Sequence, residues 1–181
     1  CVEMGHNEPS RLPVQDLRKI EALAIKACQA VGISDGVAHV EIILTNKGPK
    51  LVELGARLGG DFITSHLVPL STGVDLVKAT IQIALGEKPD LTPKLSCGSA
   101  IRFFPVKRGK ITKISGLKEA HEITGVIKIG FFKGVGDSVD VFKSSDFRVG
   151  YVIAQSNKPE KAVRICERAL ESVTIDVAIQ D

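Results

Sequence analysis

The stretch HVEIILTNKGPKLVELGAR, residues 39–57, contains two runs of alternating residues separated by a turn signal. The signal is Asn46-Lys47-Gly48, typical of a three-residue hairpin loop that ends on a left-handed glycine. Because paired strands run in opposite directions from such a loop, counting back from its closure places Glu41 opposite Glu53. The stretch therefore predicts a β-hairpin with two facing glutamates.

Alternation along the two strands gives the hairpin two chemically different faces. One face is aliphatic, and the other carries His39, Glu41, Glu53 and Arg57. Carboxylates that face each other repel, by roughly 0.2–1 kcal/mol in a solvated sheet, and a divalent cation removes that penalty. Oxygen ligands suit Mg²⁺, which binds one or two carboxylates and completes its shell with water and phosphate oxygens.

A simpler alternative is that both glutamates lie on a solvated strand face, where lysine or arginine side chains screen them. The residues that follow the second strand favour a binding site instead. Arg57-Leu58-Gly59-Gly60-Asp61 combines a guanidinium with a glycine-rich helix start. Guanidinium groups and helix N-terminal amides both bind anions, so the pattern predicts an anion site beside the metal site.

The segment from Gly36 to Gly86, with VELGARLGG at residues 52–60 in its centre, resembles the C-terminal part of an ATP-grasp domain. The resemblance implies that Glu41 and Glu53 hold the Mg²⁺ ions of ATP. It implies that Arg57 stabilises an acyl-phosphate or tetrahedral intermediate and that Gly60 lends its backbone amide to the oxyanion. Gly55 departs from the family, because many members carry Asn there as a further metal ligand.

The opening residues, Val2 to Pro9, resemble the strand and loop that cross the substrate pocket in the L-amino-acid ligase branch of this family. By that resemblance Glu3 and His6 face the amino-acid substrates. Residues 98–173 resemble the small domain that follows the grasp in carboxylase- and ligase-type members. The remaining histidines, His39 among them, are interpreted as structural.

The predicted fold class is α+β, with antiparallel sheet in both halves of the chain. A Pro-rich, charged segment at residues 87–96 is the best linker. It separates residues 1–90, the C-terminal part of an ATP-grasp domain, from residues 97–181, a small α+β C-terminal domain. Steps of three and four between apolar residues predict helices near residues 14–31 and 159–173.

Composition excludes several classes of protein. A net charge of +3 over 181 residues, with 4% aromatic residues and no Trp, argues against nucleic-acid binding. No apolar run approaches the roughly 20 residues that cross a bilayer, so no membrane association is expected. The four cysteines are far apart and form no CxxC pair. Reduced thiols and a cytoplasmic location are therefore expected.

These features predict part of an ATP- and Mg²⁺-dependent ligase that joins a carboxylate to an amine through an acyl phosphate, with an amino acid as the first-choice substrate. The expected partners are an amino acid or other carboxylate, an amine, and a second copy of the chain in a homodimer. The chain is expected to be a fragment that is inactive alone, because no segment resembles the family's glycine-rich loop or phosphate-binding lysines. The alternatives are an enzyme like carbamoyl phosphate synthase or biotin carboxylase, and a non-catalytic binding or assembly module.

Overall fold

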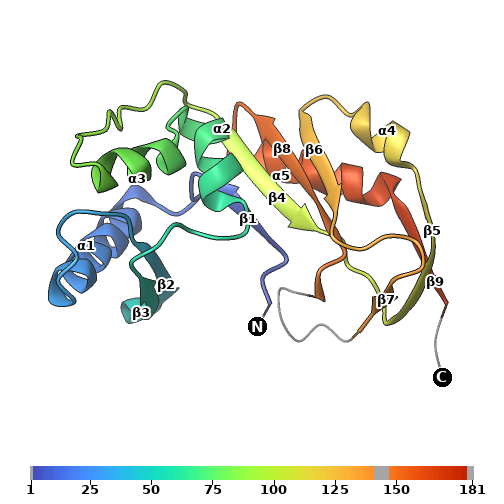
Figure 1. The fold of residues 1–181 in the computed structure, drawn as a ribbon, viewed down its shortest axis with the longest axis horizontal. Helices are drawn as coiled ribbons and strands as arrows, with labels where there is room; N and C mark the ends of the chain where they lie inside the picture. Colours follow the sequence, from blue (N-terminus) through green and yellow to red (C-terminus); the bar gives the residue numbers. More distant parts are fainter. Residues whose placement is uncertain (1, 141–146, 179–181) are drawn as a thin grey trace. The chain divides into compact units, whose positions relative to one another are not determined.

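The computed structural model of the protein describes residues 2–140 and 147–178, and the chain divides into two units (Figure 1). The sheet unit consists of residues 1–9 and 95–181, and the hairpin unit consists of residues 10–94. Each unit combines helices with antiparallel strands. The predicted α+β class is therefore confirmed.

The sheet unit takes one strand from the beginning of the chain. Strand β1 (Gly5–Glu8) pairs antiparallel with β4 (Gly98–Phe103), so residues 1–9 lie with the second half of the sequence. The division predicted at the linker is continuous along the chain, whereas the observed units are not. The reason is physical: the composition of a linker carries no information about which distant strands pair.

A four-stranded antiparallel sheet forms the centre of the sheet unit. Its strand order is β1-β4-β8-β6, with β6 at Val126–Phe131 and β8 at Gly150–Ser156. The sequence pattern predicts strands at residues 98–106, 126–132 and 148–155, which agree with β4, β6 and β8 to within a few residues. These strands are easily recognised because most of their side chains are aliphatic or aromatic.

A second sheet in the same unit has the order β7-β5-β9. Its strands are β5 (Gly109–Ser115), β7 (Ser138–Val139) and β9 (Thr174–Ala178), and a short helix, α4 (Leu117–His121), follows β5. The sequence pattern does not predict these three strands. Strand β7 has only two residues, and a register shift between Ile111 and Lys113 interrupts the alternation of β5. No residue of β9 is fully buried, so it lacks the apolar run that marks a core strand.

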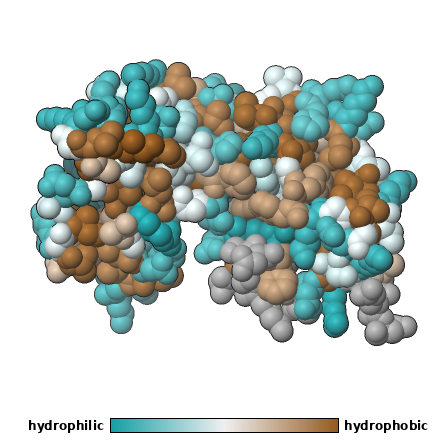
Figure 2. Space-filling model, viewed as in Figure 1, coloured by the Kyte–Doolittle hydropathy of each residue, from teal (hydrophilic) through white to brown (hydrophobic). Residues whose placement is uncertain are grey.

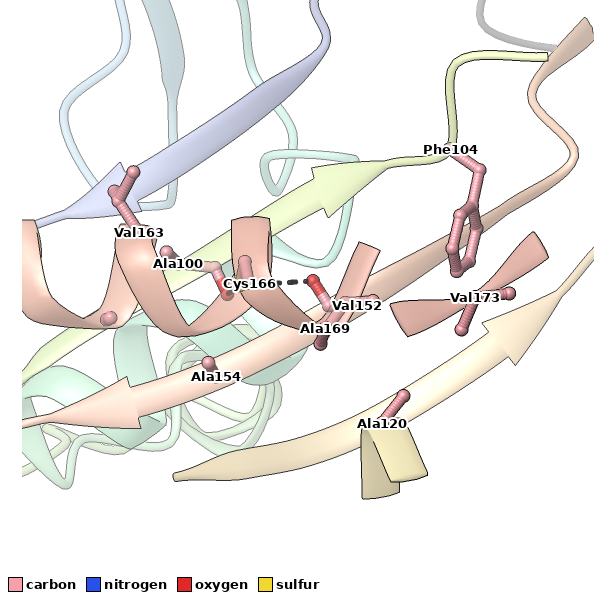
Figure 3. Packing of buried hydrophobic residues seen from close by; sticks show 10 residues of the cluster. Ala100, Phe104, Ala120, Val152, Ala154, Val163, Cys166, Ala169 and Val173 are labelled. Atoms are coloured by element: carbon pink, nitrogen blue, oxygen red, sulfur yellow. Dashed lines mark hydrogen bonds between the residues drawn. The ribbon is translucent and has the colours of Figure 1, made fainter. Parts of the chain in front are cut away.

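Helix α5 (Pro159–Ser172) packs on the four-stranded sheet and closes the main core (Figure 3). Its Cys166 is fully buried, and the thiol lies 3.4 Å from the carbonyl oxygen of Ala100 and 3.5 Å from that of Val152. Burial raises the pKa of the Cys166 thiol to about 12, so the group is a neutral packing element. The buried cluster comprises Ala100, Phe104, Ala120, Val152, Ala154, Ala162, Val163, Cys166, Ala169 and Val173.

The hairpin unit begins with α1 (Val14–Ala30), which packs against both strands of the hairpin, β2 (His39–Thr45) and β3 (Gly48–Gly55). The predicted amphipathic helix is confirmed, yet no residue of α1 is fully buried. With 17 residues, α1 is still too short and too polar to cross a membrane, and no other helix in the described ranges is long and apolar enough.

The hairpin turn differs from the predicted three-residue loop. Thr45 pairs with Gly48, so the loop has two residues, and Gly48 has a φ of 93°. The Thr45 hydroxyl donates to the Gly48 carbonyl at 2.8 Å and closes the turn. A bulge then shifts the register by one residue, because Val52 lies between the partners of Ile42 and Glu41. The loop prediction is wrong by one residue, and the bulge restores the pairing of the two glutamates.

Three short helical segments complete the hairpin unit: a π-helical turn η1 (Ile63–Leu67), α2 (Val68–Thr72) and α3 (Leu76–Ala84). The stretch Thr72-Gly73-Val74-Asp75 resembles a capping box and predicts a helix that runs to about Gly86. The helix is confirmed as α3, but its N-cap is Asp75, whose carboxylate accepts from the Lys78 backbone amide at 2.9 Å. Proline at position 69 falls in the first turn of α2, where its missing N–H is harmless.

Candidate functional site

The predicted pairing of the two glutamates is confirmed. Glu41 of β2 and Glu53 of β3 are direct partners in the antiparallel ladder, with His39 opposite Gly55 next to them. Direct partners project from the same face of a sheet, with Cβ atoms about 4.5–5.5 Å apart. The hairpin thus presents two carboxylates side by side.

Each carboxylate has a basic partner on the same unit. His39 Nε2 lies 3.3 Å from Glu41 Oε1, and Arg57 Nη2 lies 3.1 Å from Glu53 Oε1. The Arg57 and Glu53 side chains are 52% and 57% exposed, so their ion pair contributes little to stability and can open at small cost. Arg57 also donates from Nη1 to the Leu58 carbonyl oxygen at 3.2 Å.

Two glycines leave room for these basic side chains. A Cβ atom added at Gly55 would lie 3.2 Å from Arg57 Cγ, and one added at Gly59 would lie 3.0 Å from His39 Nδ1. Arg57 therefore folds back across Gly55, the position at which the sequence departs from the family. An asparagine side chain there would force Arg57 to move.

The helix expected at Gly59-Gly60-Asp61 begins later than predicted. The helical turn starts at Ile63, whose amide donates to the Gly60 carbonyl at 2.8 Å, and both Asp61 and Phe62 have positive φ, at 50° and 62°. Gly60 therefore lies in a tight turn rather than at a helix N-terminus, with open space beside its Cα. Two consecutive left-handed residues other than glycine are unusual and typical of functional sites.

The other two predicted site residues, Glu3 and His6, belong to the sheet unit. His6 is in the edge strand β1, where Arg102 Nη1 donates to its backbone oxygen at 3.1 Å. Glu3 precedes β1 and has a 57% exposed side chain. The predicted residues thus fall in two groups: Glu41, Glu53, Arg57 and Gly60 in the hairpin unit, and Glu3 with His6 in the sheet unit.

His39, which the sequence pattern leaves as structural, lies beside the glutamate pair. In the structure its ring lies between Glu41 and Gly59, and its side chain is 21% exposed. The signal was present in the sequence, because His39 shares the polar hairpin face with both glutamates. A lone histidine carries no chemical pattern of its own, however. Strand alternation by itself does not distinguish a structural histidine from one that belongs to a binding site.

The donor set of the hairpin fits one hard cation. Two facing carboxylates supply oxygen ligands of the kind that Mg²⁺ takes from proteins, while phosphate oxygens and water supply the rest. Within residues 2–140 and 147–178, no group of three or more His, Cys, Asp or Glu side chains could hold a metal by itself. The pair is therefore suited to a metal that arrives with an anionic ligand, rather than to a closed structural site.

Comparison with known families identifies two consecutive domains. Residues 7–92 match the carbamoyl-phosphate synthase L chain, ATP binding domain. Residues 102–178 match the L-amino acid ligase C-terminal domain 2. The two matches meet near the linker predicted from the sequence.

Two curated relatives agree with these matches. The L-arginine-specific L-amino acid ligase of Bacillus subtilis is 28% identical over 146 residues, which are 80% of this chain and 34% of the relative. Carnosine synthase 1 of Homo sapiens is 38% identical over 109 residues, 60% of this chain and 12% of the relative. The chain spans about a third or less of the length of each.

A solved structure shares the fold. The L-amino acid ligase from Bacillus licheniformis superposes with a TM-score of 0.84 at 23% identity, over 98% of this chain and 44% of that protein. The two matched domains indicate one family, and the superposition shows the same fold. The paired glutamates of the hairpin are consistent with this family. The chain belongs to the L-amino-acid ligase branch of the ATP-grasp family.

Proposed function

We propose that the protein carrying this chain is an ATP- and Mg²⁺-dependent ligase that joins the carboxylate of an amino acid to an amine through an acyl phosphate. The observation that carries the proposal is the direct pairing of Glu41 with Glu53, with Arg57 ion-paired to Glu53 on the same hairpin. In such a ligase ATP supplies the phosphoryl group, and Mg²⁺ offsets the charge of its phosphate oxygens.

Each predicted site residue has a role in this proposal. Glu41 and Glu53 hold the cation, and the backbone register fixes the distance between them. Arg57 leaves Glu53 when an anionic intermediate arrives, because a desolvated anion binds a guanidinium more strongly than a 57% exposed carboxylate does. Gly60 offers its amide to the developing oxyanion from the turn that precedes η1. Glu3 and His6 contact the amino-acid substrate.

The ligase proposal is favoured over the other enzymes by the second domain. A biotin carboxylase or a carbamoyl phosphate synthase would account for the match of residues 7–92, whereas the match of residues 102–178 is to an L-amino acid ligase domain. The non-catalytic alternative explains the two carboxylates by their basic partners, His39 and Arg57, but it does not explain the match of residues 7–92 to an ATP binding domain. A homodimer remains part of the proposal, as a prediction.

We also propose a cytoplasmic location, where ATP is abundant. Three cysteines, Cys28, Cys97 and Cys166, are free thiols. Free thiols are typical of a reducing compartment.

The test uses the full-length protein, supplied with pairs of L-amino acids, ATP and Mg²⁺. The proposal expects a dipeptide, ADP and phosphate in equal amounts. Glu41→Gln and Glu53→Gln should each lower kcat by about 10²-fold or more and raise the Mg²⁺ concentration at half-maximal rate. Glu21→Gln, on the exposed side of α1, is the matched control and should leave both unchanged.

Three results would contradict the proposal. Bicarbonate-dependent turnover without amino acids would favour the carboxylase-like alternative. Unchanged Mg²⁺ dependence in both glutamate variants would remove the metal site. Absence of ATP turnover under all conditions would favour the non-catalytic module.

A further inference from the structure

Arg148 is a buried cation that neither the sequence analysis nor the proposed function uses. Its side chain is 2% exposed, and it lies two residues before strand β8 in the sheet unit. Transfer of a guanidinium out of water is strongly unfavourable unless the group is paired. The contacts that compensate this burial therefore show what the residue does.

The first contact is with Glu3, at the beginning of the chain. Arg148 Nη2 donates to the Glu3 backbone oxygen at 2.8 Å and lies 3.7 Å from Glu3 Oε2. One guanidinium thus holds both the main chain and the carboxylate of the same residue. The Glu3 side chain remains 57% exposed, so its carboxylate stays accessible to a cation from solvent.

The second contact is with Phe103, a buried residue of β4. The Arg148 guanidinium carbon lies 3.8 Å above the centre of the Phe103 ring, a close cation–π geometry. The Phe103 amide donates to the Met4 carbonyl at 3.1 Å and ties the residue after Glu3 to the same strand. The His6 ring meets Phe103 edge-on, with centroids 6.5 Å apart at 85°.

We propose that Arg148 is a positioning residue: stacked on Phe103, it orients the Glu3 carboxylate, beside His6, to bind the ammonium group of the amino-acid substrate. The inference rests on the proposed function, which places Glu3 and His6 at the substrate. Its new element is the buried Arg148–Phe103 stack, which couples these two residues to the rigid centre of the sheet. A carboxylate outside a helix or strand must be ordered when it binds a ligand, at a cost in conformational entropy, whereas a carboxylate that is already held in place avoids most of that cost.

Lysine cannot replace arginine in this arrangement. The planar fork can bond the Glu3 backbone oxygen and approach its carboxylate while its face lies on Phe103, whereas an ammonium is a point charge with no stacking face. Arg148→Lys keeps the charge of the site and removes the geometry. This substitution therefore separates orientation from electrostatics.

The experiment compares an L-amino acid with its α-hydroxy analogue, which lacks the ammonium group, in ATP turnover by the full-length protein. For Arg148→Lys we expect KM for the amino acid to rise about tenfold, kcat to change less than threefold, and the preference for the amino acid over the hydroxy acid to fall about tenfold. Arg164→Lys, an exposed arginine of α5, is the matched control and should change none of these values.

Glu3→Gln tests the coupling without entering the core, because Glu3 is exposed. If Arg148 acts through Glu3, the two substitutions remove the same interaction and their effects should not add. KM of the double variant Glu3→Gln/Arg148→Lys should then lie within about threefold of that of the more impaired single variant. Phe103→Leu is the second route should Arg148→Lys not fold. It keeps an apolar side chain, removes the ring face, and should lower the amino-acid preference about threefold.

The outcomes separate this inference from the proposed function. Amino-acid turnover by the wild type, with unchanged KM and preference in both Arg148→Lys and Phe103→Leu, overturns the role of Arg148 and leaves the ligase standing. A lower melting temperature with unchanged preference also overturns it, because Arg148 is then only structural. A wild type without amino-acid-dependent turnover overturns both.

Discussion

The sheet unit and the hairpin unit are built from similar elements but differ in how many apolar side chains they bury. Most fully buried apolar side chains of the described residues lie in the sheet unit, where α5 and the four-stranded sheet enclose them (Figure 3). The hairpin unit buries few, Leu67, Val74 and Ala79, and α1 buries none. Both predicted metal ligands lie in this sparsely packed unit.

The sparse packing of the hairpin unit is also visible on its surface, where many apolar side chains are exposed. Hydrophobic atoms gather over α3 and around α1 and the hairpin in Figure 2, and the exposed apolar residues include Ile25 at 52%, Val52 at 56% and Ile81 at 57%. A unit with little enclosed core opens locally more easily than one with a dense core. Stability of this chain should therefore depend on the sheet unit, and chemistry on the hairpin unit.

The sharpest test of this contrast removes one ring from the sheet-unit core. Phe104 is 2% exposed and stacks on Phe131 with centroids 5.2 Å apart. Phe104→Ala should lower the free energy of unfolding by about 3–5 kcal/mol, because it leaves a cavity among rigid neighbours. Ile81→Ala on α3 removes a 57% exposed side chain and should cost less than about 1 kcal/mol.

Tyr151 makes this measurement specific to one unit. It is the only tyrosine, the chain has no tryptophan, and it is buried in β8 of the sheet unit. In the 181-residue chain, denaturant unfolding followed by Tyr151 fluorescence therefore reports the sheet unit. Equal losses for Phe104→Ala and Ile81→Ala would mean that the two units share one stability, and the contrast would be lost.

The next effect concerns chemistry in the hairpin unit. Arg57→Ala in the full-length protein should lower kcat by about 10²-fold, close to 2.7 kcal/mol, while the melting temperature stays nearly constant. The reason is that its present partner, Glu53, is an exposed carboxylate, so the stronger interaction is made only with an anionic intermediate. Arg57→Lys should not restore the rate, since it lacks the planar fork.

Steady-state kinetics and melting curves of the two Arg57 variants decide the matter. If Arg57 is only a counter-ion of Glu53, Arg57→Lys keeps a normal kcat. Arg57→Ala then lowers the free energy of unfolding by less than about 1 kcal/mol. Near-normal kcat in Arg57→Ala would remove the residue from the chemistry and leave the glutamate pair as the remaining candidate.

The sequence predicted the pairing of Glu41 with Glu53 although it predicted the wrong loop. A shorter loop and a one-residue bulge at Val52 compensate each other, so the glutamates still meet. Strand alternation and helical periodicity are local signals, and they predicted β2, β3, α1 and α5 for that reason.

What the sequence could not predict depends on contacts between distant residues. The pairing of β1 with β4, and the burial of Arg148 against Phe103 and Glu3, join residues far apart in the chain. An isolated arginine in a sequence is read as surface charge, because arginine is rarely buried without a partner. The position of His39 next to the glutamate pair was not predicted for a similar reason, since it depends on contacts with both Glu41 and Gly59.

The smallest predicted effect is a pH dependence in the sheet unit. Glu8 ends strand β1 opposite Ser99, and burial raises the pKa of its carboxyl above the usual 4.5. The folded state then holds this proton more tightly than the unfolded state does. The contribution of Glu8 to stability is therefore most favourable below about pH 4.5 and is lost as pH rises through the raised pKa of the folded state.

Glu8→Gln replaces the carboxyl with a neutral group of the same shape and should stabilise the sheet unit by about 0.5 kcal/mol at pH 7. The gain should shrink as pH falls and vanish below about pH 4.5, where wild-type Glu8 is itself protonated. Tyr151 fluorescence in denaturant at several pH values measures it, with the exposed Glu122→Gln as the matched control. A gain that is independent of pH would show that burial of charge is not its cause. If Glu8→Gln instead lowered the free energy of unfolding at pH 7, the fold would stabilise the ionised carboxylate. The dense packing that distinguishes the sheet unit from the hairpin unit would then not extend to its edge strand β1.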